Sequence, residues 1–190
     1  NFVVALLNDL FGIQARGGCS CAGPYGHRLL GIDLMRAREY EAAVQMGCEA
    51  LKPGWVRMNF NYFISETVFE FLLDAGELIA NEGWKLLPDY RFEPENSLWR
   101  HRFKKLEAAM NLMDVTYRCG KMQYRSRHAT EPEWALAGYI QEAKKIIAAR
   151  EVLDRDTPRK RYGFDSELDR LRWFPLPNEI NERLPHKPAA

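Results

Sequence analysis

The sequence has no long hydrophobic run. The apolar stretch at its start, residues 2–7, is followed directly by Asn8 and Asp9, and no later window is much longer. A membrane-spanning helix needs about 20 apolar residues, and a signal peptide carries a basic segment before its apolar run. The sequence therefore predicts neither feature within these residues, and we expect no membrane partner.

The sequence also has almost no net charge. Its 27 Lys and Arg residues and 26 Asp and Glu residues leave a formal charge of +1. Two short basic runs, at 100–105 and 155–161, have acidic neighbours that cancel much of their charge. A protein that binds nucleic acid through its phosphates needs a concentrated positive surface, so we expect no nucleic-acid partner.

Cysteine is sparse and is not arranged as a framework. The four cysteines, Cys19, Cys21, Cys48 and Cys119, contain no C-x-x-C pair, which is typical of a reducing compartment and leads us to expect a cytoplasmic location. Cys19 and Cys21 with His27 offer three candidate ligands near one loop. Zinc prefers four ligands at other spacings, so we expect no metal site.

The remaining composition is that of a folded protein. Of the 190 residues, 46% are hydrophobic and 28% are charged, which excludes a wholly disordered chain and allows one domain, or one domain with a tail. The chain starts at Asn1 without an initiator methionine and enters an apolar run at once. We interpret this start as a cut within a longer chain.

Hydrophobic spacing predicts alternating helices and strands in the first half. Apolar residues at helical spacing predict helices over 2–11, 33–46 and 65–82. The helix boundaries are indicated by a C-cap and two N-caps: Gly12, Asp33 and Ser65. Strict alternation predicts a strand at 55–60, with Val56, Met58 and Phe60 on one face, and a shorter strand is expected at 13–16.

The second half reads as more helical. Apolar residues at 3-4-3-4 spacing predict a two-heptad helical seam over 103–117, formed by Phe103, Leu106, Met110, Met113 and Tyr117. Thr130 and Glu133 form a capping box before a helix over 131–152, whose buried face would hold Trp134, Ala137, Ile140 and Ile147. After Asp154 we expect an extended tail with a short helix near 165–172.

These patterns predict the α+β fold class. We expect a small antiparallel or mixed sheet with helices packed on one face, followed by a helical C-terminal extension. The predicted division places a small domain at 1–92 and the extension with its Pro-rich, charged tail at 93–190.

The most informative stretch is the glycine-rich segment 16–24, which reads Arg-Gly-Gly-Cys-Ser-Cys-Ala-Gly-Pro. It places thiols on a loop just after an arginine, and a nearby cation favours the reactive thiolate form. A loop of this composition can carry a thiol to a substrate bound elsewhere. From the residues alone, a structural cysteine beside a turn remains the alternative.

This segment resembles the cysteine loop of the cysteine desulfurases and selenocysteine lyases, which belong to the class V aminotransferase family of pyridoxal-phosphate enzymes. Residues 56–63, which read Val-Arg-Met-Asn-Phe-Asn-Tyr-Phe, resemble a second motif of that family. The two motifs occur in the family's order. The resemblance covers about residues 1–85 and implies the small C-terminal domain of that fold.

The resemblance implies a role for three residues. Cys21 matches the nucleophile that takes sulfur from a substrate cysteine as a persulfide. Arg57 matches the arginine that pairs with the substrate α-carboxylate, a task that suits its two-pronged guanidinium. Arg16 matches the arginine that precedes the cysteine loop. From the residues alone, Arg57 could equally be a surface arginine in a weak salt bridge, and in an aminotransferase or epimerase Cys21 would be a bystander.

The resemblance also implies what this chain does not contain. The Schiff-base lysine and most of the phosphate site lie in the family's large domain, and no Ser/Thr-x-His-Lys segment occurs in these residues. We therefore expect no tightly bound pyridoxal phosphate and no activity without that domain. Whether this chain counts as an enzyme is thus left open.

The expected function is that of a C-terminal part of a pyridoxal-phosphate enzyme acting on cysteine or a related amino acid. Its partners would be that small substrate, the large domain and, as is usual in the family, a second subunit in a homodimer. The alternative is a helical protein-interaction or assembly module without catalysis, built on the segments 103–117 and 131–152.

Overall fold

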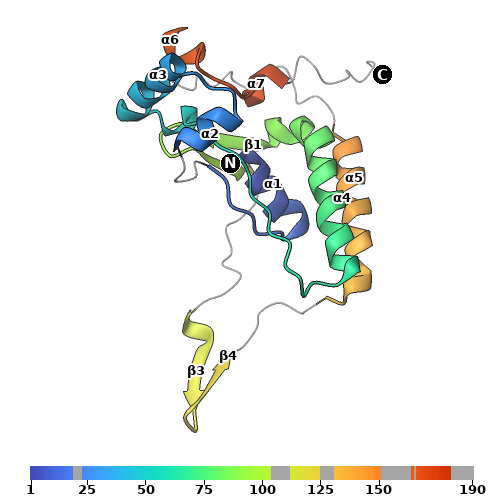
Figure 1. Cartoon of the computed structure of the whole chain (residues 1–190). Coiled ribbons are helices and arrows are strands. Elements are labelled where there is room, and N and C mark those ends of the chain that lie inside the picture. The colour runs from blue at the N-terminus through green and yellow to red at the C-terminus, as the bar shows by residue number, and fades with distance from the viewer. Residues whose placement is uncertain (19–22, 104–111, 125–130, 151–163, 165, 181–190) are drawn as a thin grey trace.

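The computed structural model of the chain describes most of its residues. Those outside the description are 19–22, 104–111, 125–130, 151–163, 165 and 181–190. The described part contains helices and two small antiparallel sheets, which confirms the α+β class (Figure 1). Among its helices, none has both the length and the apolar character that crossing a membrane requires.

The N-terminal half is mainly helical. Its helices are α1 (Phe2–Phe11), α2 (Gly23–Leu29), α3 (Leu34–Gln45) and α4 (Glu66–Glu82). The three predicted caps are confirmed. Gly12 ends α1 in the left-handed conformation, with φ of 67°, while the side chains of Asp33 and Ser65 accept hydrogen bonds from the backbone at the starts of α3 and α4.

Short 3₁₀ segments, small sheets and three more helices make up the remaining regular structure. One 3₁₀ segment, Glu49–Leu51, follows α3, and another, Gly83–Asp89, follows α4. The remaining helices are α5 (Leu136–Ala148), α6 (Ser166–Asp169) and α7 (Pro177–Ile180). The first sheet pairs β1 (Tyr90–Glu93) with β2 (Leu98–His101), and the second pairs β3 (Val115–Arg118) with β4 (Lys121–Tyr124).

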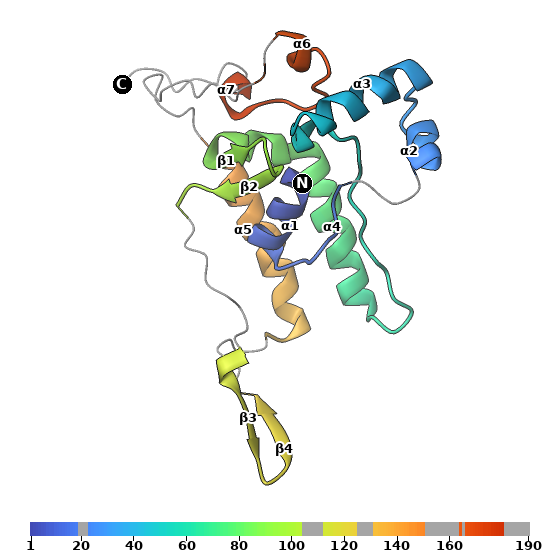
Figure 2. The same cartoon turned by 90° about the vertical axis from the view of Figure 1, so that its left-hand side faces the viewer.

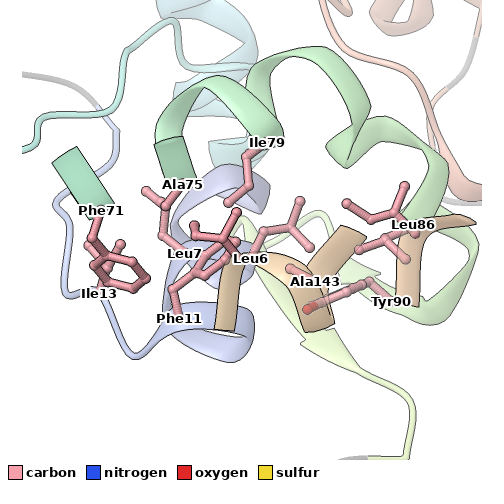
Figure 3. Close-up of a cluster of buried hydrophobic side chains, with 12 residues drawn as sticks. Leu6, Leu7, Phe11, Ile13, Phe71, Ala75, Ile79, Leu86, Tyr90 and Ala143 are labelled. Carbon is pink, nitrogen blue, oxygen red and sulfur yellow. The ribbon is translucent and has the colours of Figure 1, made fainter. Parts of the chain in front are cut away.

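The main hydrophobic core lies between α1, α4 and α5. These helices lie side by side in both views of the molecule (Figures 1 and 2). Their buried residues include Leu6, Leu7, Phe71, Ala75, Ile79, Ile140, Ala143 and Ile147 (Figure 3). Helix α5, from the segment expected to form a separate extension, thus contributes to the same core as α1.

The predicted strand at 55–60 is wrong as an extended element. Only Arg57 pairs there, in an isolated bridge with Arg16, and the strand expected at 13–16 is likewise reduced to that bridge. A strand needs a neighbour along its length to satisfy its backbone, and among the described residues this pairing continues only through one bond, from Trp55 N to Gly18 O. The predicted facing is partly correct, because Val56 and Met58 pack on the core whereas Phe60 is exposed.

The predicted heptad helix over 103–117 is wrong at the residues that the structure describes. A 3₁₀ turn at Leu112–Asp114 leads into β3, and the side chains of Met113 and Tyr117 are exposed. Leu106 and Met110 lie outside the described residues. The β-branched residues Val115 and Thr116 favour a strand locally. Directly after β3, Cys119 and Gly120 adopt the left-handed conformation that a tight hairpin turn requires.

The helix near residue 136 is confirmed, but its predicted start is wrong. A 3₁₀ turn, Glu133–Ala135, precedes α5, and the carboxylate of Glu133 accepts a hydrogen bond from Ser65 Oγ at 2.6 Å instead of closing a capping box. Thr130 lies outside the described residues. Ile140 and Ile147 are buried as expected, whereas Trp134 is 80% exposed and Ala137 is also exposed.

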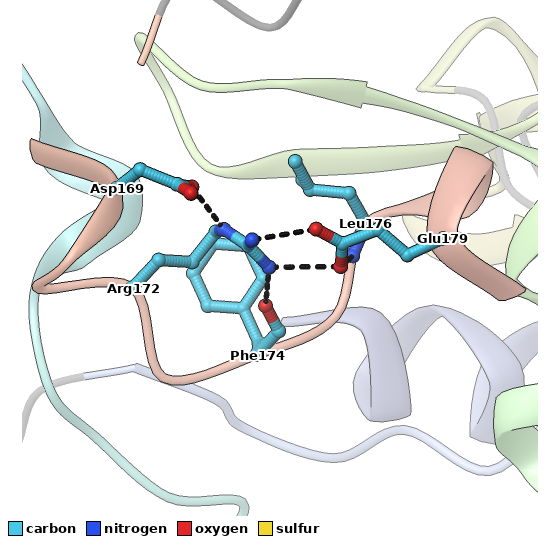
Figure 4. A network of polar contacts seen from close by, with 5 residues as sticks. All are labelled: Asp169, Arg172, Phe174, Leu176 and Glu179. Carbon is cyan, nitrogen blue, oxygen red and sulfur yellow. Dashed lines mark hydrogen bonds and ion pairs between the residues drawn. The ribbon is translucent and has the colours of Figure 1, made fainter. Parts of the chain in front are cut away.

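The segment 166–180 is not an extended tail. Leu171, Leu176 and Ile180 are buried against other parts of the chain, and α6 lies within the range where a short helix was expected. The guanidinium of Arg172 binds Asp169, Glu179 and the carbonyl of Phe174, as Figure 4 shows. Periodicity could not reveal this packing because the segment's apolar residues are separated by prolines and charges.

Candidate functional site

The structure brings Arg16 and Arg57 together. Their backbones form an antiparallel bridge in which Arg57 N donates to Arg16 O at 2.8 Å and Arg16 N donates to Arg57 O at 3.2 Å. One more bond, from Trp55 N to Gly18 O at 3.3 Å, continues the contact. The two motif segments, far apart in the sequence, therefore lie side by side.

The bridge has a consequence for the side chains of the two arginines. Directly opposed residues of an antiparallel pair point to the same face, so both guanidiniums emerge on one side of the paired segments. Both residues are exposed, and within the part of the chain that the structure describes neither has an acidic partner. Two guanidiniums on one face can bind a carboxylate.

Two glycines shape the start of the cysteine loop. A Cβ at Gly17 would lie 2.7 Å from Val4 Cγ2, so the backbone can approach α1 only without a side chain there. Gly18 has φ of 101°, a conformation that side chains rarely adopt. Cys19 and Cys21 follow outside the described residues, so their positions relative to Arg57 stay predictions.

The far end of the loop is anchored to the same motif segment. Helix α2 begins at Gly23, and a Cβ at its buried Gly26 would lie 2.9 Å from Cζ3 of Trp55. Trp55 lies two residues before Arg57. Because Gly18 bonds to the backbone of Trp55 and Gly26 contacts its side chain, both ends of the loop are held next to the Arg57 segment.

The described residues do not fit pyridoxal phosphate by themselves. The amines of Lys52, Lys85 and Lys145 each face a glutamate three residues earlier on partly or largely exposed helical turns. A Schiff-base lysine must instead lie in a cavity that also encloses the cofactor ring and phosphate. Of the described lysines, Lys52 lines a cavity of about 540 Å³, but its side chain is 45% exposed and its amine faces Glu49 at 3.8 Å, so it is not enclosed in the way that a Schiff-base lysine is.

Metal ligands do not gather in the described residues. No group of three or more His, Cys, Asp or Glu side chains there could hold an ion. Because Cys19 and Cys21 lie outside those residues, the expectation of no metal at that pair stays a prediction.

Two buried polar contacts elsewhere have a structural role. Tyr90 donates from its hydroxyl to Asp9 at 3.0 Å, and burial together with that carboxylate raises the pKa of Tyr90. Arg150 contacts Asp89 at 2.8 Å; burial raises the pKa of Asp89 against the opposing effect of Arg150, His101 and Arg102. Both contacts tie the first sheet and the segment before it to the helices.

Sequence reasoning missed an aromatic cavity beside the motif segments. It has a volume of about 540 Å³, and four of the chain's five tryptophans line it: Trp55, Trp84, Trp99 and Trp173. The only sign of this cavity in the sequence is the number of tryptophans. The four that line it come from separate segments, which the tertiary fold brings together.

Comparison with known proteins yields no relative: no family model, no curated protein and no solved structure matches this chain.

Proposed function

We propose that this chain is the C-terminal part of a pyridoxal-phosphate enzyme of the class V aminotransferase family, acting on cysteine or a related amino acid. The observation that carries the proposal is the bridge between Arg16 and Arg57. It joins the two segments on which the family resemblance rests and sets two arginines on one face beside the cysteine loop.

In this proposal Arg57 binds the α-carboxylate of the amino-acid substrate. Its guanidinium offers two parallel N–H donors to the two carboxylate oxygens. Arg16 emerges on the same face and adds a second positive charge, which strengthens the attraction for an anion. A small substrate that carries one carboxylate needs such local charge and no strongly charged surface, in agreement with the chain's net charge of +1.

The family resemblance gives Cys21 the role of sulfur acceptor. Its thiolate form is favoured by nearby cations, and the exposed Arg16 lies five residues earlier on the segment that leads into the loop. The cofactor, held by the large domain, supplies the electron sink for the chemistry. Without that domain the chain binds no pyridoxal phosphate tightly and is inactive. The proposal also includes a cytoplasmic location and a homodimer.

Substitution of Arg57 tests the carboxylate role. In the protein that joins this chain to its pyridoxal-phosphate domain, Arg57→Lys keeps the charge and removes the paired donors. We expect KM for L-cysteine to rise about tenfold, which corresponds to loss of about 1.4 kcal/mol of binding. Arg38→Lys, on the exposed surface of α3, is the matched control and leaves KM unchanged. Equal KM values for the two variants contradict the proposal.

A second candidate function, a protein-interaction module, is favoured by the β3–β4 hairpin. Its pairs Val115/Tyr124 and Tyr117/Met122 make one face apolar, and the alternate pairs make the other face polar. The hairpin extends away from the helices in both views (Figures 1 and 2). If this face binds a second copy of the chain, replacing Tyr117 and Met122 by serine should abolish the self-association measured by light scattering. An unsubstituted chain that is monomeric contradicts the hypothesis that the hairpin binds a second copy.

A further inference from the structure

The aromatic cavity is built from several separate parts of the chain. The start of α1, the segment 49–56, the turn before β2 and the segment 173–175 all line it. A volume of about 540 Å³ lies within the range of small-molecule sites in proteins, which is about 300–1,000 Å³. Because its walls come from segments that are distant in the sequence, the cavity forms only when the chain folds.

One wall of the cavity is a continuous set of packed rings. Phe92 stacks on Trp99 with ring centroids 4.4 Å apart, and Phe174 meets Phe92 edge-on at 5.5 Å. Trp173 continues the set with an edge contact to Phe174 at 5.6 Å. This wall is held in place by the Arg172 network, which binds the carbonyl of Phe174 (Figure 4).

The other two indoles of the cavity are not stacked on one another. Trp55 is fixed against Gly26, and Trp84 is fixed by a hydrogen bond from Nε1 to Asn81 O at 3.1 Å. Within the described part of the chain, neither of them pairs with another aromatic ring. The Lys85 ammonium lies over the Trp84 ring, 5.8 Å from its centroid. Aromatic faces prefer another ring in stacked or edge contact, so Trp55 and the face of Trp84 away from Lys85 can receive one from a ligand.

The polar groups around the cavity are largely used within the protein. Asn1 donates from Nδ2 to both the carbonyl and the hydroxyl oxygen of Ser97 at 3.0 Å, and Trp173 Nε1 donates to Leu51 O at 3.3 Å. The charges of Glu49 and Lys52 offset each other at 3.8 Å on the rim. The lining side chains therefore present no charge without an opposite charge nearby, and most of the surface that they offer a ligand is apolar or aromatic.

We propose that this cavity is a binding site for a neutral, planar aromatic or heteroaromatic group of a small molecule, which packs against the Trp99 and Trp173 wall and the indoles of Trp55 and Trp84. This site is separate from the proposed carboxylate role of Arg57, and its existence does not depend on the proposed enzyme function. Half-exposed Trp173 and Val3 lie at the cavity and leave it open to a ligand.

The distribution of tryptophans gives a direct test. The 190-residue chain is labelled with 5-fluorotryptophan, its five fluorine resonances are assigned with single Trp→Phe variants, and it is titrated with 2-naphthol. We expect saturable shifts of the four cavity tryptophans, with Trp134, which is 80% exposed and does not line the cavity, unchanged. No shift up to millimolar probe, or shifts that include Trp134 to the same degree, overturns the proposal.

A size-matched comparison tests the aromatic part. Decahydro-2-naphthol has the same carbon skeleton without an aromatic ring. Because an aromatic pair adds about 0.5–1.5 kcal/mol beyond its buried area, we expect 2-naphthol to bind about two- to tenfold more tightly. Equal affinity for the two compounds overturns the requirement for an aromatic ring.

A filling substitution tests the location. Ala80→Phe places a ring in the cavity and should weaken 2-naphthol binding at least tenfold, whereas Ala137→Phe, on the exposed surface of α5, should leave it unchanged. Val3→Phe serves the same purpose if the first variant does not fold. Unaltered binding in a folded cavity-filling variant overturns the proposal.

Discussion

Gly17, in the cysteine-loop motif, provides a prediction whose size follows from the structure. A Cβ at this position would lie 2.7 Å from Val4 Cγ2 and 2.9 Å from Asn1 Oδ1, whereas ordinary contacts begin near 3.4 Å. Asn1 can rotate away, but Val4 is β-branched and stiff in its helix. In Gly17→Ala, the loop or the start of α1 must therefore move by several tenths of an ångström.

Overpacking of this kind costs about 1–3 kcal/mol. We expect Gly17→Ala to lower the free energy of unfolding by about 2 kcal/mol, which corresponds to a fall in Tm of about 4–8 °C for a chain of this length. Urea unfolding followed by circular dichroism measures the free energy, and a calorimetric scan measures Tm.

Gly138→Ala is the matched control. Gly138 lies inside α5 with nothing within 4 Å of its added Cβ, so the same substitution there removes only the helix penalty of glycine. It should stabilise the protein by about 0.5–1 kcal/mol. If both variants change stability in the same direction, the close approach of the loop to α1 is refuted.

Three further predictions concern polar contacts. Hydrogen bonds to Asp169 and Glu179 raise the pKa of Arg172 although burial opposes its charge, so Arg172→Leu should lower the free energy of unfolding by about 2–3 kcal/mol in urea titrations. The hydrogen bond from Arg170 holds the pKa of Glu39 below its ordinary value of 4.5. The stability it contributes is therefore present above pH 4.5 and is lost as the pH falls through the lowered pKa, and Glu39→Gln should flatten that acid dependence in thermal scans. Ser65→Ala removes the N-cap of α4 and should cost about 1 kcal/mol, measured as a lower Tm.

For each of these three variants, one outcome would contradict the prediction. A fully stable Arg172→Leu variant would show that the segment 166–180 is held by burial of Leu171, Leu176 and Ile180 without the Arg172 contacts. An acid dependence unchanged in Glu39→Gln would place the responsible carboxylate elsewhere. A Ser65→Ala variant as stable as the starting protein would mean that the start of α4 is held by its packing and not by its cap.

The helices were predictable because their signals are local. The left-handed cap at Gly12 and the N-caps at Asp33 and Ser65 lie within a few residues of the turns that they satisfy. The apolar face of α5 was also visible in its spacing, through Ile140 and Ile147. Local hydrogen bonding and helical periodicity require no knowledge of the rest of the fold.

The errors arose where distant partners decide the structure. Alternation at 55–60 is equally consistent with a strand and with an irregular segment that packs on a core. The two are distinguished by the extent of pairing, which among the described residues is limited to the Arg16–Arg57 bridge and the bond from Trp55 to Gly18. The 3-4-3-4 spacing at 103–117 predicted a helix, whereas the turn at Cys119 and Gly120 pairs β3 with β4 as a hairpin. Glu133 bonds to Ser65, a partner that no capping pattern could reveal.

The candidate site was predictable in part. Two motifs pointed to Arg16 and Arg57, and the structure pairs their backbones, although their role stays a prediction. The aromatic cavity was not predictable, because Trp55, Trp84 and Trp173 carry no shared pattern and meet only through tertiary packing.

The proposed enzyme function is tested most directly at Cys21. Sulfide release from L-cysteine is measured for the protein that joins this chain to its pyridoxal-phosphate domain, and then for its Cys21→Ala variant. Cys119→Ala, which removes an exposed free thiol on the β3–β4 hairpin, is the control. We expect release to be lost in Cys21→Ala and retained in Cys119→Ala; release that persists unchanged in Cys21→Ala contradicts the proposal.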